Sequence, residues 1–85
     1  MTYKVIFSQD AEKDLDLLDR KNRTRIIKKL DHIKGHPLDY VKHLVGIPLY
    51  SLRVGDYRVI MDIKTKEILI FVIKVGHRSK VYGNP

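Results

Sequence analysis

The sequence predicts an α+β protein in which two consecutive helices pack on one face of a sheet. Two changes of pattern carry this prediction. Apolar residues recur at three- and four-residue spacing between positions 8 and 34, as in amphipathic helices, and at every second position from residue 49 onward, as in strands. Helices and strands that are grouped along the chain, rather than alternating, are typical of α+β folds. The 85 residues contain no internal repeat and no low-complexity segment, so we expect a single domain over residues 1–85.

Residues 2–7 are rich in β-branched and aromatic side chains and are predicted to form an N-terminal strand. Ser8 follows where a helix N-cap belongs, and the acidic residues after it favour the positive end of a helix dipole. In the helix that begins there, Ala11, Leu15 and Leu18 recur at helical spacing. We therefore expect one stripe of this helix to face the core.

A second helix, completing a two-helix hairpin, is predicted from an apolar stripe of Ile26, Ile27, Leu30 and Ile33. The segment Gly35-His36-Pro37 ends it, because proline lacks a backbone N–H and disfavours helix at the residue before it. An irregular connection is expected from Leu38 to Pro48.

Three strands are predicted after that connection. Residues 49–54 alternate in character with a period of two, and residues 57–63 form the returning strand. After a turn at residues 64–66, the nearly unbroken apolar run 68–75 is expected to lie centrally in the sheet. These strands make an antiparallel three-strand meander, with the helices packed on one face of it.

The turn Gly55-Asp56 predicts the register of the first two strands of the meander. A two-residue hairpin loop at this position sets Arg53 directly across from Arg58, with both side chains on the same face of the sheet. Like charges that face each other across two strands are mildly destabilising. A bound anion between the two arginines would relieve that cost, so we predict phosphate binding here.

A second basic cluster follows the last strand and contains His77, Arg78, Lys80 and Tyr82. Arginine binds a phosphate through two parallel hydrogen bonds, and lysine adds a point charge. Tyrosine can hydrogen-bond or stack on a base, and an imidazole can act as an acid or a base. No acidic residue follows Glu67 to neutralise the cluster. The sequence therefore predicts an RNA phosphodiester site formed by the two clusters.

The net charge of +7, from 17 Lys and Arg against 10 Asp and Glu, indicates a polyanionic partner such as nucleic acid or an acidic protein. Acidic residues crowd positions 10–19, and basic residues crowd positions 20–34. Two interpretations stay open for this pattern. The helices are either solvated faces held by mutual ion pairs, or the basic helix contacts nucleic acid.

Several classes of protein are excluded by composition. The chain has no cysteine, which leaves no disulfide framework, thiolate metal site or thiol nucleophile. It also has neither an apolar signal core nor a stretch approaching the ~20 apolar residues of a membrane span. We expect a cytoplasmic protein that does not contact the membrane.

The segment Gly55-Asp56-Tyr57-Arg58-Val59, followed by Val75-Gly76-His77-Arg78-Ser79-Lys80-Val81-Tyr82, resembles the RelE branch of the RelE/ParE toxin superfamily. The order of the predicted elements matches that family over essentially the whole chain. The resemblance implies a RelE-like fold and a toxin that enters the ribosomal A site and cleaves messenger RNA there. It also implies an antitoxin of the RelB type as the inhibiting partner.

The resemblance further implies roles for three residues. Arg58 matches the arginine that contacts the scissile phosphate, Arg78 the second arginine, and Tyr82 the C-terminal tyrosine near the nucleophile. The remaining basic residues, Arg53, His77 and Lys80, are candidates for binding RNA phosphates. The best-studied bacterial members carry lysines where this chain has Leu49 and Ser51, so the resemblance does not identify the general base.

The expected reaction needs neither a metal nor another cofactor. RNA supplies its own nucleophile, the 2′-hydroxyl, so the protein has only to align it with the phosphorus, stabilise the added negative charge and move two protons. Arg58 and Arg78 suit the stabilisation of charge. Tyr82 suits the orientation or deprotonation of the 2′-hydroxyl.

Two other functions remain open. A ParE-like chain would share the fold but inhibit DNA gyrase by protein contact, without cutting RNA. A catalytically inactive family member would only bind its antitoxin. In each case we expect an acidic, partly helical antitoxin that covers the basic face, in a toxin-antitoxin complex that is a higher-order hetero-oligomer.

Overall fold

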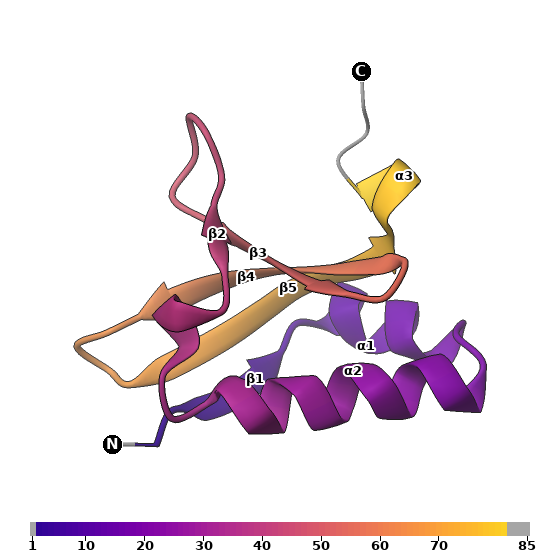
Figure 1. Cartoon of the computed structure of the whole chain (residues 1–85), viewed down its shortest axis with the longest axis horizontal. Helices are drawn as coiled ribbons and strands as arrows, with labels where there is room; N and C mark the ends of the chain where they lie inside the picture. Colours follow the sequence, from indigo (N-terminus) through magenta and orange to yellow (C-terminus); the bar gives the residue numbers. More distant parts are fainter. Residues whose placement is uncertain (1, 82–85) are drawn as a thin grey trace.

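A computed structural model of the chain describes residues 2–81 and has the α+β architecture that the sequence predicts (Figure 1). In chain order the elements are β1 (Lys4–Phe7), α1 (Gln9–Asp16), α2 (Arg20–Ile33), the 3-10 turn η1 (Pro37–Asp39), β2 (Lys42–His43), β3 (Tyr50–Val54), β4 (Tyr57–Lys64), β5 (Leu69–His77) and α3 (Arg78–Val81). Both α1 and α2 lie on the same side of the sheet (Figure 1). No helix within residues 2–81 is long and apolar enough to cross a membrane.

The described strands form one sheet in the order β1-β5-β4-β3-β2. The meander of β3, β4 and β5 is antiparallel, as predicted, and β5 is an interior strand between β1 and β4, while β4 is the middle strand of the sheet. The first strand pairs with β5 in parallel, with Lys4 opposite Leu69 and Phe7 opposite Val72. The N-terminal strand therefore occupies one edge of the sheet, which leaves its outer side uncovered within residues 2–81.

Ser8 is the N-cap of α1, as the sequence predicts. Its backbone is extended, and its hydroxyl oxygen accepts a hydrogen bond of 3.0 Å from the N–H of Ala11. The same hydroxyl donates to the carbonyl of Ile73 at 2.8 Å. A second contact comes from Asp14, whose carboxylate accepts a hydrogen bond of 2.9 Å from the N–H of Val75. Both contacts hold α1 against the part of β5 that leads to the C-terminal basic cluster.

The contact between α1 and α2 does not consist of mutual ion pairs. Within the described part of the chain, the acidic residue Asp14 pairs with Lys74 of β5, at 3.5 Å, rather than with α2. Arg23 of α2 instead donates to the carbonyls of Leu15 and Leu18, at 3.2 and 3.0 Å. A guanidinium suits this position, because the last carbonyls of a helix carry partial negative charge. Within residues 2–81, α1 and α2 thus form no ion pair with each other.

The core lies between the two helices and the sheet. Its helical part includes Ala11, Leu15, Ile26, Leu30 and Ile33, all of which were predicted to face inward. Leu18 packs at the margin of the core. Its strand part is formed by alternate residues of β3, β4 and β5, including Leu52, Val59, Met61, Ile70 and Val72. The opposite face of the meander is covered by neither α1 nor α2 and is called the open face below; the short helix α3 lies on this side, at the end of β5 (Figure 1).

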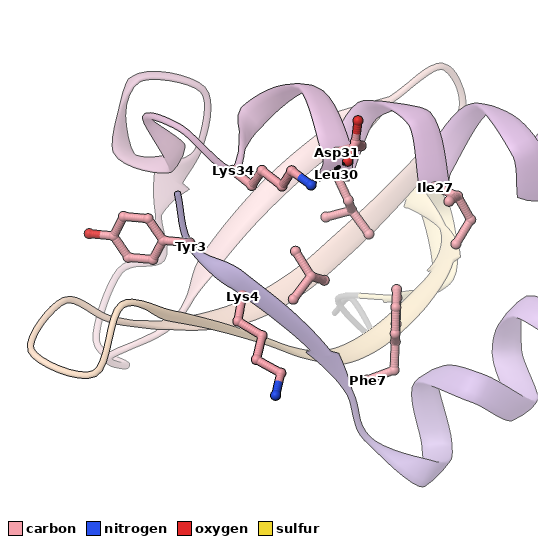
Figure 2. A pocket seen from close by; sticks show the side chains of 8 residues that line it. Tyr3, Lys4, Phe7, Ile27, Leu30, Asp31 and Lys34 are labelled. Atoms are coloured by element: carbon pink, nitrogen blue, oxygen red, sulfur yellow. Dashed lines mark ion pairs between the residues drawn. The ribbon is translucent and has the colours of Figure 1, made fainter. Parts of the chain in front are cut away.

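Ile27 was predicted to join this core and does not. Its side chain is 42% exposed because it faces a groove between α2 and β1 instead of the centre of the sheet. Figure 2 shows Ile27, Tyr3 and Phe7 around this groove, which has a volume of about 270 Å³. The pair Lys34–Asp31 forms its rim on α2, at 2.6 Å. We call it the β1 groove.

The connection between α2 and the meander is more ordered than the sequence suggests. The segment predicted to be irregular, Leu38 to Pro48, contains the end of η1 and all of the short strand β2. In β2, Lys42 pairs with Ser51 and His43 with Tyr50. Two residues are too few to show an alternation, so this strand could not be predicted from its pattern. It pairs only with the beginning of β3, and no other described strand pairs with the edge from Leu52 onward, which is called the open edge of β3 below.

Candidate functional site

The open face carries the paired arginines at the end of the meander nearest the β3–β4 turn. Arg53 lies opposite Arg58, and Val54 opposite Tyr57, which confirms the register predicted from the turn. Gly55 in this turn has a φ of +60°, a conformation that suits glycine because it lacks a Cβ atom. The chemistry of this two-residue turn thus places two guanidinium groups side by side.

Each of these arginines is held by a contact on its own hairpin. Arg58 Nη1 donates to the hydroxyl of Ser51 at 3.4 Å, and Arg53 Nε donates to the carbonyl of Gly55 at 3.3 Å. Arg58 is half-buried, whereas Arg53 is exposed. On its other side, Arg58 is paired with Gly76 of β5, which has no side chain. A ligand that approaches the open face therefore meets Arg58 without a side chain from this neighbour in the way.

The second basic cluster reaches the same place through the backbone. The N–H of Arg78 donates to the carbonyl of Asp56 in the β3–β4 turn, at 2.9 Å. Arg78 is the first residue of α3 and is exposed. Figure 1 shows α3 beside the β3–β4 turn, at the end of β5. The structure therefore brings together Arg53, Arg58 and Arg78, which the sequence predicted as parts of one site.

His77 is arranged to accept rather than donate through Nδ1. The Ser79 N–H donates to this nitrogen at 3.3 Å, and the Ser79 hydroxyl lies 2.8 Å from it. Because the backbone N–H can only donate, the neutral ring carries its proton on Nε2. The ring also meets that of Tyr57 edge to face, with centroids 5.8 Å apart. His77 thus helps to fix the start of α3 next to the arginines.

Two predicted residues fall outside the described part of this site. Lys80 belongs to the helical segment α3, but its side chain lies outside the described residues. Tyr82 lies entirely outside them. The roles predicted for these two side chains therefore stay predictions.

Sequence reasoning missed two residues near the site. Ser51 was noted only as a replacement for a lysine, yet its buried hydroxyl is the partner of Arg58. Arg25 of α2 was noted only as part of a basic run, yet its guanidinium lies directly against Gly55: an added Cβ there would be 2.9 Å from Nη2. The predicted hairpin register already places Ser51 on the same face as Arg58, diagonally across the two strands, whereas the contact of Arg25 depends on how α2 packs on the hairpin.

The described geometry suits the binding of a phosphodiester. Arg53 and Arg58 lie side by side on the open face, the backbone of Arg78 is bonded to the adjoining turn, and each guanidinium can offer several N–H donors to phosphate oxygens. Stabilisation of negative charge as it develops on a phosphate is the kind of catalysis that such fixed donors provide. The arrangement of donors is thus of a kind that suits a phosphate ligand.

Comparisons with known proteins identify the family of this chain. A family model described as the ParE toxin of the type II toxin-antitoxin system, parDE, matches residues 5–82. The mRNA interferase toxin RelE of Escherichia coli strain K12 is 31% identical to this chain over 88 residues, which covers 98% of this chain and 93% of the relative.

Solved structures of toxin-antitoxin complexes have the same fold. The RelBE2 toxin-antitoxin complex from Mycobacterium tuberculosis contains a chain with a TM-score of 0.86 and 25% identity, covering 92% of this chain and all (100%) of that one. The archaeal RelE-RelB complex from Pyrococcus horikoshii OT3 contains a chain with a TM-score of 0.80 and 30% identity, covering 95% and 100%. The described sheet and helices are therefore shared over nearly the full length of these chains.

Proposed function

Because this chain belongs to the RelE branch of the RelE/ParE family of type II toxins, we propose that it is a ribosome-dependent endoribonuclease that cleaves messenger RNA in the ribosomal A site. The observation that carries this proposal is the convergence of Arg53, Arg58 and Arg78. The first two face each other on the open face, and the N–H of the third is bonded to the turn between them. Inhibition of translation in the cytoplasm follows from this reaction.

In the proposed mechanism the messenger supplies the nucleophile. The 2′-hydroxyl attacks the adjacent phosphorus, the bond from phosphorus to the 5′ oxygen breaks, and the products are a 2′,3′-cyclic phosphate and a 5′-hydroxyl. One proton leaves the 2′-hydroxyl and another reaches the departing 5′ oxygen. Arg58 and Arg78 stabilise the added charge on the phosphate oxygens, and Tyr82 orients or deprotonates the 2′-hydroxyl.

The other predicted residues position the RNA in this scheme. Arg53 and Lys80 bind neighbouring phosphates, and His77 holds the start of α3 through its contacts with Ser79. The reaction uses no metal, because the arginines supply the positive charge that a metal would otherwise provide. A phosphorothioate at the scissile bond should therefore slow cleavage equally with Mg²⁺ and Mn²⁺. A rescue by Mn²⁺ would point to a metal at the reacting phosphate.

The decisive experiment adds the purified protein to ribosomes programmed with a defined messenger RNA and maps new 5′ ends by primer extension. Cuts confined to the A-site codon are expected from the wild type. The same RNA without ribosomes should stay intact. Arg78→Ala should lose the cuts, because it removes a donor to the phosphate while its backbone bond to Asp56 can still form. Full cleavage by this variant would remove Arg78 from the mechanism.

Gyrase inhibition is a second candidate function, and one finding favours it: the family model that matches residues 5–82 is described as the ParE toxin. Both names belong to one superfamily with one fold, so fold does not choose between them. The paired arginines of the open face favour RNA. A supercoiling assay with purified gyrase separates the two functions, because inhibition without cleavage on ribosomes would establish the ParE-like activity.

The proposed partner is an acidic, partly helical antitoxin of the RelB type. Similar chains from M. tuberculosis and P. horikoshii occur in complexes with their antitoxins. A net charge of +7 speeds association with an acidic chain, and cover over Arg58 and Arg78 would block the phosphate site. We expect the complex to be a higher-order hetero-oligomer. Toxicity on expression alone, relieved by such a partner, tests this part of the proposal.

A further inference from the structure

A second cationic surface lies beside the hairpin, between α2 and the open edge of β3. Its volume is about 530 Å³, and it is called the α2 groove below. The residues that line it are Arg25, Lys28, Lys29, His32, Arg53, Val54 and Gly55. Four of them come from α2 at helical spacing, and three from the end of β3 and its turn. Residues far apart in the sequence thus form one continuous basic surface.

The α2 groove is closed at one end by a contact between backbone and side chain. Atoms of the Arg25 guanidinium would lie 2.9 to 3.2 Å from a Cβ atom added to Gly55, so the guanidinium lies directly against the backbone of this turn. The guanidinium is thereby placed against the turn that also carries Arg53. The α2 groove and the open face consequently meet at the β3–β4 turn.

His32 lines the other part of the α2 groove, and Tyr40, which is not part of the lining, lies next to His32 and Lys29. Lys29 Nζ lies 5.3 Å from the centroid of the Tyr40 ring, and the His32 ring meets the same tyrosine edge to face at 5.3 Å. Tyr40 is 44% exposed, so part of its ring remains accessible. Exposed aromatic rings beside cations are the surfaces on which nucleic-acid bases stack.

No carboxylate is among the described residues that line the α2 groove. The acidic residue of α2 nearest in sequence, Asp31, is paired with Lys34 at the β1 groove instead. Arg23, which α2 does use for its contact with α1, is not part of the lining. The cations of the α2 groove are therefore available to a ligand from outside the chain.

We propose that the α2 groove binds the phosphate backbone of RNA outside the codon that is cleaved. This inference rests on the proposed function and extends it, because it assigns a second RNA contact on a different surface from the reacting phosphate. Arg53 lines the α2 groove and also faces Arg58. An RNA strand held along α2 is thus led to the site of cleavage by a residue that both surfaces share.

The composition of the α2 groove favours RNA over an acidic protein. Stable protein interfaces have a centre of apolar and aromatic contacts, whereas interfaces with nucleic acid are much more positively charged. Val54 is the only aliphatic residue in the described lining, and its side chain is 8% exposed. Binding of an acidic helix would find little apolar surface here to bury.

The test compares two double variants that have the same net charge. The groove variant combines Arg25→Ala and Lys28→Ala, which are both exposed residues of α2. The control variant combines Lys13→Ala and Lys66→Ala, which are exposed residues outside the α2 groove. Binding to vacant ribosomes and to a labelled messenger oligonucleotide is measured by anisotropy or filtration across a series of salt concentrations.

The groove variant should bind RNA about 10- to 100-fold more weakly near 0.1 M salt, and the salt dependence of log K should fall by about 2 relative to the control. On programmed ribosomes it should raise KM by a similar factor and leave kcat nearly unchanged, since contacts outside the cleaved codon bind the ground state and transition state alike. Loss on vacant ribosomes identifies ribosomal RNA as the ligand. Loss only on the oligonucleotide identifies the messenger.

Equal RNA affinity of the groove and control variants would overturn the inference. Loss of antitoxin affinity in the groove variant, with its RNA affinity unchanged, would overturn it as well. Circular dichroism establishes that each variant is folded, and the single charge reversals Lys28→Glu and Lys66→Glu repeat the comparison if a double variant is not. The two proposals fail separately. If RNA binding depends on the α2 groove but the wild type cleaves no RNA, the proposed nuclease activity is rejected. If the groove variant cleaves RNA with an unaltered KM, the proposed role of the α2 groove is rejected.

Discussion

The two faces of β4 differ in what they contribute. Val59 and Met61 point toward the helices and are fully buried, at 0% exposure, in the core. Arg58 and Asp62 alternate with them and point to the open face, where Arg58 meets Ser51 and Arg53. Because side chains of a strand alternate between faces, one strand supplies both the stability of the fold and the candidate chemistry. Stability and activity should therefore be separable by substitutions at adjacent positions.

Met61→Ala should have the largest effect on stability. Truncation of a fully buried methionine removes apolar contacts and leaves a cavity, which lowers the free energy of unfolding by about 2–5 kcal/mol. Urea denaturation measures this change, with Met61→Leu as a control of similar volume that should cost less than about 1.5 kcal/mol. Cleavage per folded molecule should be retained. A specific loss of activity in folded Met61→Ala would mean that the two faces are not independent.

Arg58→Ala should have the converse effect. Loss of a fixed donor to the reacting phosphate is expected to lower cleavage on programmed ribosomes by about 10²–10³-fold. The fold should be retained, because the substitution also removes the facing like charge of Arg53 and Arg58. Arg58→Lys keeps the charge but loses the paired donors, so its cleavage rate should lie between those of the wild type and Arg58→Ala. Equal activity of wild type and Arg58→Ala would reject the open face as the site of cleavage.

The same contrast explains how far the sequence predicts this molecule. The positions of Arg53 and Arg58 followed from a two-residue turn, because hairpin geometry is local. The parallel pairing of β1 with β5 and the short strand β2 did not follow, since both depend on partners distant in the sequence. Ile27 was misplaced for a related reason: helical spacing predicts which residues share a stripe, but not where the edge of the sheet lies.

The candidate site shows the same division. Its arginines were predicted from residue type, turn and family resemblance, and the structure places Arg53, Arg58 and Arg78 together. The contact from α2 was not predictable, whereas the register predicted from the turn already puts Ser51 diagonally across from Arg58 on the same face. Ser51 beside Arg58 and Arg25 against Gly55 arise from cross-strand register and from the packing of α2 on the hairpin. Sequence thus indicated the charged groups, while the contact from α2 required the three-dimensional arrangement.

Ser8→Ala should have a smaller effect, confined to stability. It removes the cap of α1 and the hydrogen bond to the carbonyl of Ile73, so the free energy of unfolding should fall by about 1–2 kcal/mol. Ser8→Thr keeps the hydroxyl and should lose much less. The contacts of Ser8 lie on the helical side of the sheet, so the variant should cleave as fast as the wild type at a temperature at which both are fully folded. An activity loss without a stability loss would show that α1 positions the C-terminal cluster.

Ser51→Ala should have the smallest effect. It tests the contrast between the two faces of the sheet at a residue that is both buried and on the open face. Ser51 is 4% exposed, like a core residue, yet it belongs to the open face and bonds to Arg58. The N···O distance of 3.4 Å is long, so the hydrogen bond is weak. Its removal should raise the activation free energy of cleavage by only about 0.5–1 kcal/mol, which lowers the cleavage rate about two- to fivefold.

A double-variant cycle with Arg58→Lys identifies the route by which Ser51 acts. If Ser51 works by holding the guanidinium, the effects of Ser51→Ala and Arg58→Lys on the cleavage rate should not be additive, because the second substitution removes the group that the first one releases. Additive effects would mean that Ser51 contributes to the open face independently of Arg58. In that case burial, rather than the hydrogen bond, would be what this position supplies.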